Sequence, residues 1–428
     1  FKDRQKKKKK VLMILYQFPP CNDVGAFRPV KFIRYLKKYG WFPIVLAPSN
    51  AFYASYDWEK EKNLGNACKI YRSPMINPVF FFLYINNGVL KKYCSFLWQA
   101  MNRILLPDVA ILWIAGAINK SLNIIKNEKI DVVFVSGQPF STFIIAWIIK
   151  LMTGKPLVLD YRDPWTLNSF HKVSRFRLLV ERKLEKWILN DADAAVFTSS
   201  EARSQQIEFF KEQSSLEKLF DITNSFEPIS KRKKKRETAK NFLINHAGNF
   251  YGNRNPDFFF RGLSKAIEQE SGLKEKIKVE FIGGGYSHYE ALLTRLSIRH
   301  FVEFKARVPY DQLFTRMQMA DILLIVNSFG TGHHVFIPAK FFDYLRAERP
   351  ILCLAKEGAL KKVVRKSKSG LVVDPENEKE ICDAILSLFY TNGKAAEKKN
   401  NEELRFFRKR FESANTTREL SQIFNQLV

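Results

Sequence analysis

Charged side chains near the start of one predicted helix in the second half of the chain could bind a phosphorylated ligand. In the stretch IPAKFFDYLRAERPIL, a helix begins at Pro338 and continues through Ala339 and Lys340, and Asp343 lies on the same face as Lys340. The unpaired N–H groups of a first helical turn attract anions. The alternative is an ordinary Lys340–Asp343 ion pair, which would add only about 0.2–0.5 kcal/mol.

Two loops add further candidates for binding an anion. Gly25, in FPPCNDVGAFRP, lies between a predicted buried strand and a helix, where its small size lets backbone N–H groups approach a ligand. Such a glycine can also serve the turn geometry alone. Arg254, in HAGNFYGNRNPDFFF, follows another predicted strand and could neutralise a phosphate or remain a solvated loop residue.

A third group of charges follows the predicted strand PLVLDY. Asp160, Arg162 and Asp163 stand at its carboxyl end, where we expect them to face a cleft rather than the core. There they could hold a sugar. The alternative is a salt network among the three that fixes the loop.

Metal chemistry is not indicated. His333 and His334 are adjacent on a loop, and no third ligand stands at a suitable spacing. We therefore expect the two histidines to be solvated or locally packed, and we predict neither a metal site nor a cofactor.

The elements that must position these residues alternate along the chain. Short, almost continuous apolar runs such as DVVFVSG and DILLIVN are separated by helical patterns, which predicts parallel sheets covered on both faces. We expect two Rossmann-like, doubly wound domains facing a cleft, an α/β class. The N-terminal domain spans 1–226, a basic linker 227–240 and the C-terminal domain 241–410. A final helix at 411–428 could return to the N-terminal domain.

Composition agrees with two globular domains and an anionic partner. The 428 residues are 46% hydrophobic, and 70 Lys and Arg against 43 Asp and Glu give a net charge of +27. Such an excess attracts phosphorylated substrates, lipid surfaces or nucleic acid. Five dispersed cysteines without a CxxC pair favour a reducing compartment over a disulfide framework.

Two segments bear on membrane association. The apolar run at 11–16 is too short for a signal peptide, so we expect a basic tail leading into a buried strand. The apolar stretch VAILWIAGAI falls short of a bilayer span, and no transmembrane helix is expected. The basic and aromatic region 71–120 predicts either an insertion folded onto the sheet or a surface that lies on an anionic bilayer.

The order of several segments resembles one enzyme family. These are YQFPPCNDVGAFRPVKFIRYLKKYGWFPIVL, DYRDPW, DADAAVFTSS, ITNSFEP, HAGNFY and PAKFFDYL. Together, from about Val11 to the C-terminus, they resemble the GT-B fold glycosyltransferases of the family-four type. The resemblance implies an N-terminal domain that binds the acceptor and a C-terminal domain that binds a nucleotide-sugar. It also implies transfer with retention of configuration and without a bound metal.

The resemblance also implies roles for several donor-binding residues. Gly25 matches the loop that touches the donor phosphates, and Arg254 matches a basic residue for the diphosphate, while Asn249 replaces the usual upstream arginine. Asp343 matches the second glutamate of the Glu-x7-Glu pattern, which holds the ribose. Val335 stands at the first glutamate and cannot take its role.

For catalysis, the resemblance places Arg162 where many members carry a histidine, before Asp163. Those two residues are the catalytic candidates, with Asp163 and Arg162 orienting the acceptor hydroxyl.

The sequence thus predicts a metal-independent hexosyltransferase acting on a lipid-linked or cell-envelope glycan, in polysaccharide biosynthesis. We expect it in the cytoplasm, peripheral to the inner face of an anionic membrane and without a nucleic-acid partner. Two alternatives are a sugar-nucleotide epimerase of the same fold and a non-enzymatic basic scaffold. The lysine runs at 6–10 and 231–235 are the features that favour the scaffold.

Overall fold

The computed structural model divides the chain into two compact units. Unit 1 comprises Phe1–Ser225 together with Ser413–Val428, and unit 2 comprises Phe226–Glu412. The structure describes residues 8–53, 55–76, 88–210, 216–228, 241–250, 254–284, 287–327, 329–391 and 402–428. Most of the basic linker predicted at 227–240, with its lysine run, and the first residues of the basic tail lie outside the described residues.

Unit 1 is built on a seven-stranded parallel sheet in the order β3-β2-β1-β4-β5-β6-β7. The strands are β1 (Lys9–Ile14), β2 (Trp41–Pro48), β3 (Lys69–Ser73), β4 (Val132–Gly137), β5 (Leu157–Tyr161), β6 (Ala194–Phe197) and β7 (Leu219–Asp221). All six residues of β4 are buried, as expected for a parallel strand covered on both faces. The strand order reverses between β1 and β4, which makes their carboxyl ends a topological switch point.

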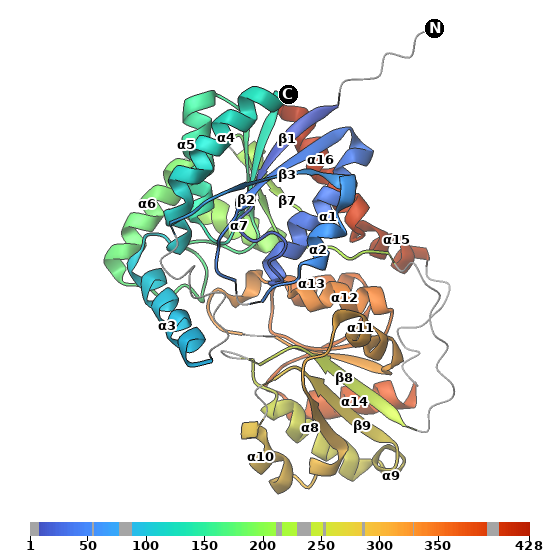
Figure 1. Ribbon diagram of the computed structural model, residues 1–428. Helices are drawn as coiled ribbons and strands as arrows, with labels where there is room; N and C mark the ends of the chain where they lie inside the picture. Colours follow the sequence, from blue (N-terminus) through green and yellow to red (C-terminus); the bar gives the residue numbers. More distant parts are fainter. Residues whose placement is uncertain are drawn as a thin grey trace. The chain divides into compact units, whose positions relative to one another are not determined.

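Helices cover both faces of this sheet (Figure 1). The helices of unit 1 are α1 (Phe27–Leu36), α2 (Glu59–Lys62), α3 (Gly88–Ile104), α4 (Ile114–Glu128), α5 (Ser141–Thr153), α6 (Arg175–Asp191), α7 (Ser200–Phe209) and α16 (Ser413–Leu427), of which α3 does not lie on the sheet. The C-terminal helix α16 packs against α1. Its Phe424 ring lies 5.1 Å from the Trp41 ring and 6.0 Å from the Phe134 ring, so α16 completes the core of unit 1.

The described parts of the aromatic region 71–120, residues 71–76 and 88–120, form more regular structure than the sequence indicated. A 3-10 turn at Val109–Trp113 leads directly into α4, and together Val109–Glu128 is long and apolar enough, by length and composition, to cross a membrane. The apolar helix is therefore longer than the ten-residue stretch that the sequence indicated, but a buried core helix meets the same test, so the expectation of no transmembrane helix stays a prediction. In unit 1, α4 packs against α5 and the sheet, with Ala117, Ser121 and Ile124 buried.

Unit 2 repeats the same topology with six parallel strands in the order β10-β9-β8-β11-β12-β13. The strands are β8 (Phe242–Ala247), β9 (Ile277–Ile282), β10 (Val302–Lys305), β11 (Ile322–Val326), β12 (Ile351–Leu354) and β13 (Gly370–Val373). The helices are α8 (Asp257–Gln269), α9 (Ser271–Lys274), α10 (Glu290–Arg295), α11 (Tyr310–Met319), α12 (Ala339–Ala347), α13 (Ala359–Lys366), α14 (Glu378–Tyr390) and α15 (Glu402–Arg410). Here the switch point lies between β8 and β11.

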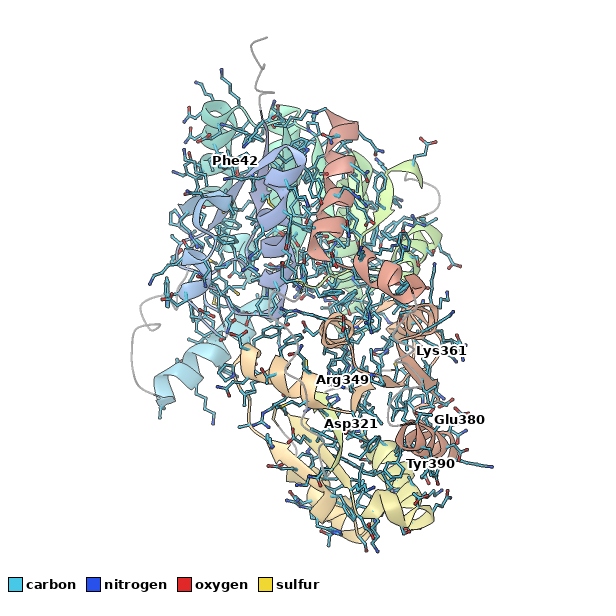
Figure 2. The ribbon with its side chains drawn as sticks, turned by 90° about the vertical axis from the view of Figure 1, so that its right-hand side faces the viewer. Phe42, Asp321, Arg349, Lys361, Glu380 and Tyr390 are labelled. Carbon is cyan, nitrogen blue, oxygen red and sulfur yellow. The ribbon has the colours of Figure 1, made fainter. Side chains whose placement is uncertain are left out.

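Two hydrophobic clusters sandwich the sheet of unit 2. One is formed largely with α8, α10 and α14, and the other with α11, α12 and α13. At the amino edge of the sheet, Asp321, labelled in Figure 2, accepts the N–H of Leu243 at 2.6 Å and fixes the starts of β8 and β11. The prediction of two doubly wound α/β domains is confirmed.

Candidate functional site

A buried histidine marks the switch point of unit 2. His246, near the end of β8, is fully buried, and its Nδ1 lies 2.9 Å from the carbonyl oxygen of Leu324 on β11. A carbonyl only accepts, so Nδ1 carries the proton and Nε2 is left as an acceptor. Burial, and then the neighbouring Lys340, hold the pKa of His246 well below its usual value. The ring is therefore neutral, and it can accept a hydrogen bond from a cation.

That cation is Lys340, on the first turn of α12. Its Nζ lies 3.3 Å from His246 Nε2. It also lies against Gly248, where a Cβ would come within 2.9 Å of Nζ and where φ is +116°. Burial, and then the charge of Arg254, lower the pKa of Lys340 to about 7. Among the described residues, no carboxylate lies within ion-pair distance of Lys340.

A second cation, Arg254, acts on the same group of side chains. Arg254 lowers the pKa of His246 and Lys340, and it also lowers that of His333, for which burial is the larger cause. Pro338 is the N-cap of α12, and no side chain caps the free N–H groups that begin with Ala339. The carboxyl edge of this sheet thus combines positive side chains with an uncapped helix start, the arrangement that binds a phosphate group.

The structure gives Asn249 a role that the sequence did not reveal. Its Oδ1 accepts the N–H of Gly284 at 2.9 Å, which links the loop after β8 to the loop after β9. The residue that stands in place of the family's arginine therefore fastens two loops of this edge. Val335 is 1% exposed, so the position of the first family glutamate belongs to the hydrophobic core.

Asp343 points away from Lys340. Its Oδ1 accepts the hydroxyl of Tyr310 on α11 at 2.6 Å, and that hydroxyl also receives a hydrogen bond from Arg346 at 3.3 Å. Burial and the Asp343 carboxylate raise the pKa of Tyr310. The intrahelical Lys340–Asp343 pair is therefore not formed. A ribose bound by Asp343 would have to share or displace the Tyr310 hydroxyl.

In unit 1 the structure brings Gly25 and Arg162 together. Arg162 Nη1 donates to Gln17 Oε1 at 2.6 Å, and Nε lies 3.8 Å from Asp163 Oδ2. A Cβ on Gly25 would lie 1.7 Å from Arg162 Nη1 and 1.6 Å from Gln17 Oε1. Burial lowers the pKa of Arg162, and Asp163 opposes that shift. A side chain at position 25 would therefore displace the Arg162–Gln17 pair, which fills the space beside this glycine.

Asp160 does not face a cleft, and that expectation is wrong for this residue. It is fully buried and accepts hydrogen bonds from Arg28 Nε at 3.0 Å and Nη2 at 2.9 Å, and from the Ser136 hydroxyl at 2.8 Å. Arg28 on α1 is its ion-pair partner, so Asp160 leaves the predicted network, of which the Arg162–Asp163 pair remains. No pattern in the sequence pointed to Arg28.

Two buried glutamates on α6 hold the loop that follows Asp163. Glu181 Oε2 accepts from Trp165 Nε1 at 3.3 Å, and Glu185 Oε2 accepts from the Thr166 hydroxyl at 2.5 Å. Both glutamates are 0% exposed. Burial raises the pKa of Glu185. The helix that reads as highly charged in sequence therefore directs two carboxylates inward, and these position Asp163 and Arg162.

In the described part of the chain, no three His, Cys, Asp or Glu side chains lie close enough together to hold a metal ion. The four cysteines with described side chains (Cys21, Cys68, Cys353 and Cys382) are free thiols.

Two family models match this chain. One, described as "Glycosyl transferases group 1", matches residues 241–390, and the other, "Glycosyltransferase Family 4", matches residues 100–214. Together they cover more than half of the chain. No curated protein matches.

Solved structures with the same fold cover nearly the whole chain. A glycosyltransferase from Rickettsia africae ESF-5 has 14% identity and a TM-score of 0.65, over 98% of each chain. Alr3699/HepE from Anabaena, in complex with UDP-glucose, has 14% identity and a TM-score of 0.62, over 97% of this chain and 100% of that one. The lipopolysaccharide outer core galactosyltransferase WaaB has 12% identity and a TM-score of 0.61, over 98% and 100%. At these identities the structures establish the fold alone.

Two doubly wound parallel sheets, similar to these structures over nearly the full length, define the GT-B architecture. The two family matches specify the enzyme class within it. The chain belongs to the GT-B fold glycosyltransferases of the group 1 and family-four type, as its sequence predicts.

Proposed function

We propose that this glycosyltransferase moves a hexose from a nucleotide-diphosphate donor to a lipid-linked or cell-envelope glycan, with retention and without a bound metal. One observation carries the donor part. Lys340 lies at the uncapped start of α12 beside neutral His246, with its pKa lowered to about 7 and Arg254 nearby. A diphosphate would place negative charge beside Lys340, which has no carboxylate within ion-pair distance among the described residues. The UDP-glucose bound to the Anabaena structure is consistent with that donor class.

The reaction follows from where charge develops. The bond between the anomeric carbon and the diphosphate oxygen breaks, the acceptor oxygen forms the new bond to that carbon, and the acceptor's hydroxyl proton passes to the leaving diphosphate. The leaving diphosphate gains negative charge, which Lys340, Arg254 and the amides of α12 would stabilise more strongly than the ground state. Asp163, held near Arg162, would accept a hydrogen bond from the acceptor hydroxyl. Gly25 would let its loop approach the donor phosphates.

Nucleotide binding tests the donor assignment. A thermal-shift screen with uridine, guanosine and adenosine diphosphates and their sugars should show stabilisation by one nucleotide, by RT ln(1 + [L]/Kd). Lys340→Met should remove most of the shift, whereas Lys361→Met, on α13 and labelled in Figure 2, should retain it. A chain that no nucleotide stabilises would contradict the assignment.

Product analysis separates this proposal from the epimerase alternative. A glycosyltransferase needs an acceptor for productive turnover, whereas an epimerase converts the donor sugar alone. Conversion of the intact nucleotide-sugar to its epimer in the absence of acceptor would therefore favour the alternative.

An exposed apolar surface supports the membrane part of the proposal. Six large apolar side chains on α3 and α6 are between 58% and 80% exposed. They are Val89, Tyr93, Phe96, Ile104, Phe176 and Leu179, and we call them the α3–α6 surface. Arg177 joins the two helices by donating from Nη1 to the carbonyl of Arg103 and from Nη2 to that of Pro107, each at 2.5 Å.

The charges around this surface are of one sign. Lys92, Arg103, Lys172 and Arg175 are exposed, and α3 contains no acidic residue. Apolar side chains ringed by Lys and Arg suit the headgroup region of an anionic bilayer, where each basic residue contributes about 1 kcal/mol. We therefore place this face against the cytoplasmic leaflet, where a lipid-linked acceptor would be found.

Vesicle sedimentation tests that placement. The chain should pellet with vesicles containing phosphatidylserine, less so as salt rises, and weakly with phosphatidylcholine alone. Phe96→Ser with Phe176→Ser should reduce binding about tenfold or more, whereas Leu151→Ser, equally exposed on α5, should not. Equal binding by both variants would exclude this surface as the docking site.

A further inference from the structure

A cavity in unit 1 lies apart from the Arg162–Gln17 pair and has no assigned role. Its volume is about 380 Å³, within the range of ligand pockets. It is lined from the carboxyl end of β2, from the loop after β1 and from α2. The lining residues on which the argument depends are Ser49, Tyr56, Trp58, Glu61 and Arg72.

The loop that carries the aromatic wall is held in place by backbone contacts. Cys21 and Tyr56 form an antiparallel bridge. The N–H of Asn22 donates to Ser55 at 3.0 Å, and that of Asp57 donates to Pro20 at 2.7 Å. The cavity is therefore built against the same β1 loop that contains Gly25, at the edge of the sheet where ligands bind in this fold.

Two exposed aromatic rings line this cavity. Tyr56 and Trp58 are stacked with ring centroids 6.3 Å apart and an interplanar angle of 16°, and Trp58 is 63% exposed. The negative face of an aromatic ring attracts the weakly positive C–H groups of a flat ligand. A pyranose ring presents such a C–H face on one side and hydroxyl groups around its rim.

The charged side chains on the polar side of the cavity are paired with each other. Arg72 pairs with the Glu61 carboxylate and donates to the carbonyl oxygens of Pro48, at 3.1 Å, and Pro19. The exposed hydroxyl of Ser49 lies on the same rim. Because the cation is already paired, this cavity does not favour an anion. Its donors and acceptors suit the hydroxyl groups of a neutral ligand.

We propose that this cavity binds a neutral pyranose ring of the glycan acceptor. The C–H face of the ring packs on Trp58 and Tyr56, and its hydroxyls contact Glu61, Arg72 and Ser49. The proposal rests on the proposed transferase function, because it names the acceptor subsite of that reaction. It adds a position that determines acceptor specificity without holding the donor.

Saturation-transfer NMR provides the test, with methyl α-glucopyranoside, methyl α-galactopyranoside and methyl N-acetylglucosaminide as probes. The chain should bind at least one of them, and Trp58→Ala should weaken that binding tenfold or more. Trp187→Ala removes a similarly exposed tryptophan on α6 and should leave it unchanged. Glu61→Gln should weaken it less than Trp58→Ala does and keep the melting temperature.

The donor assignment is checked in the same samples with UDP, GDP and ADP. Nucleotide binding should be equal in the wild-type chain, Trp58→Ala and Trp187→Ala. A wild-type chain that binds none of the pyranosides, or a Trp58→Ala variant that binds them equally, overturns the acceptor subsite. Pyranoside binding without any nucleotide binding overturns the donor assignment instead and leaves the cavity as a sugar site.

Discussion

The switch points of the two sheets share one topology but differ in their charge. In unit 1, Asp160 is matched by Arg28, and Arg162 contacts Gln17 and lies near Asp163. In unit 2, Lys340 meets only neutral His246 among the described residues, and Arg254 adds to the positive charge. The charges of the first switch point are paired with each other, whereas Lys340 at the second has a neutral neighbour and a lowered pKa.

This difference separates the two functions expected of a glycosyltransferase. A diphosphate donor needs a cation and free backbone amides, and we propose that Lys340 and the first turn of α12 supply them. A glycan acceptor is neutral, and the compensated edge of unit 1, with its aromatic cavity, suits it better. The topology is common to both units, so the side chains at the switch point decide what each sheet binds.

The largest effect should come from breaking the neutral pair of unit 1. Arg28→Ala leaves Asp160 buried without its cation, and removing one partner of a buried pair costs about 3–5 kcal/mol. Urea unfolding should show this loss. Lys62→Ala, which breaks an exposed pair with Glu59, should change stability by less than about 1 kcal/mol. If Arg28→Ala and Lys62→Ala lost similar amounts of stability, the Arg28–Asp160 pair would matter no more to folding than an exposed ion pair does.

Removing the cation of unit 2 should affect binding rather than folding. Lys340→Met should lower the affinity for the donor nucleotide about ten- to hundredfold, because a charge-assisted hydrogen bond to phosphate contributes about 1.5–3 kcal/mol. The folded state should be as stable or more stable, since a cation in this half-buried place opposes folding. Calorimetric titration and urea unfolding measure the two effects. Unchanged affinity would show that the diphosphate does not reach α12.

Titration of Lys340 should make donor binding depend on pH. Its pKa of about 7 lies below the ordinary lysine value, and a bound diphosphate favours the charged form. Binding above pH 7 should therefore take up a proton, and affinity should fall by at most tenfold per pH unit between pH 7 and 9. Calorimetry in buffers of different ionisation enthalpy measures the uptake, which Lys340→Met should lack.

The titration of Lys340 should also make the free energy of unfolding depend on pH. Between about pH 7 and 10.5 the unfolded chain holds the Lys340 proton and the ligand-free folded chain does not. The free energy of unfolding should therefore gain a contribution that rises with pH through this window. Comparing the pH profiles of wild type and Lys340→Met isolates that contribution.

The smallest effect sharpens the role of Asp343. Asp343→Ala should weaken nucleotide binding about tenfold or more if the carboxylate holds the ribose. Tyr310→Phe removes the hydroxyl that Asp343 now accepts, so it should change affinity only a few-fold, toward tighter binding. If both variants leave the Kd unchanged, Asp343 serves only to join α11 and α12.

The sequence predicted the elements better than the pairings between them. Apolar runs such as those of β4 and β11 indicate buried parallel strands directly, and Pro338 correctly placed the start of α12. Arg28 and Asp160 lie 132 positions apart, and nothing local links them. The two inward glutamates of α6 look like surface charge, because helical spacing shows neighbours on a face but not the element packed against it.

The same limit explains Asp343. Its spacing from Lys340 predicts a shared face, but its partner Tyr310 comes from another helix. The family resemblance supplied roles for Gly25 and Arg254 that spacing alone left open. Those roles remain predictions, with Arg254 now found among the cations around Lys340.

The return of α16 to the first sheet determines how the enzyme can be dissected. A fragment ending at residue 225 would leave the Trp41 and Phe134 rings without Phe424, and the Trp41 indole N–H would lose its Asn425 acceptor. Such a fragment should aggregate or fold poorly unless the last helix is supplied as a separate peptide or joined by circular permutation. Unit 2, by contrast, is one uninterrupted stretch of chain and is the piece to express alone.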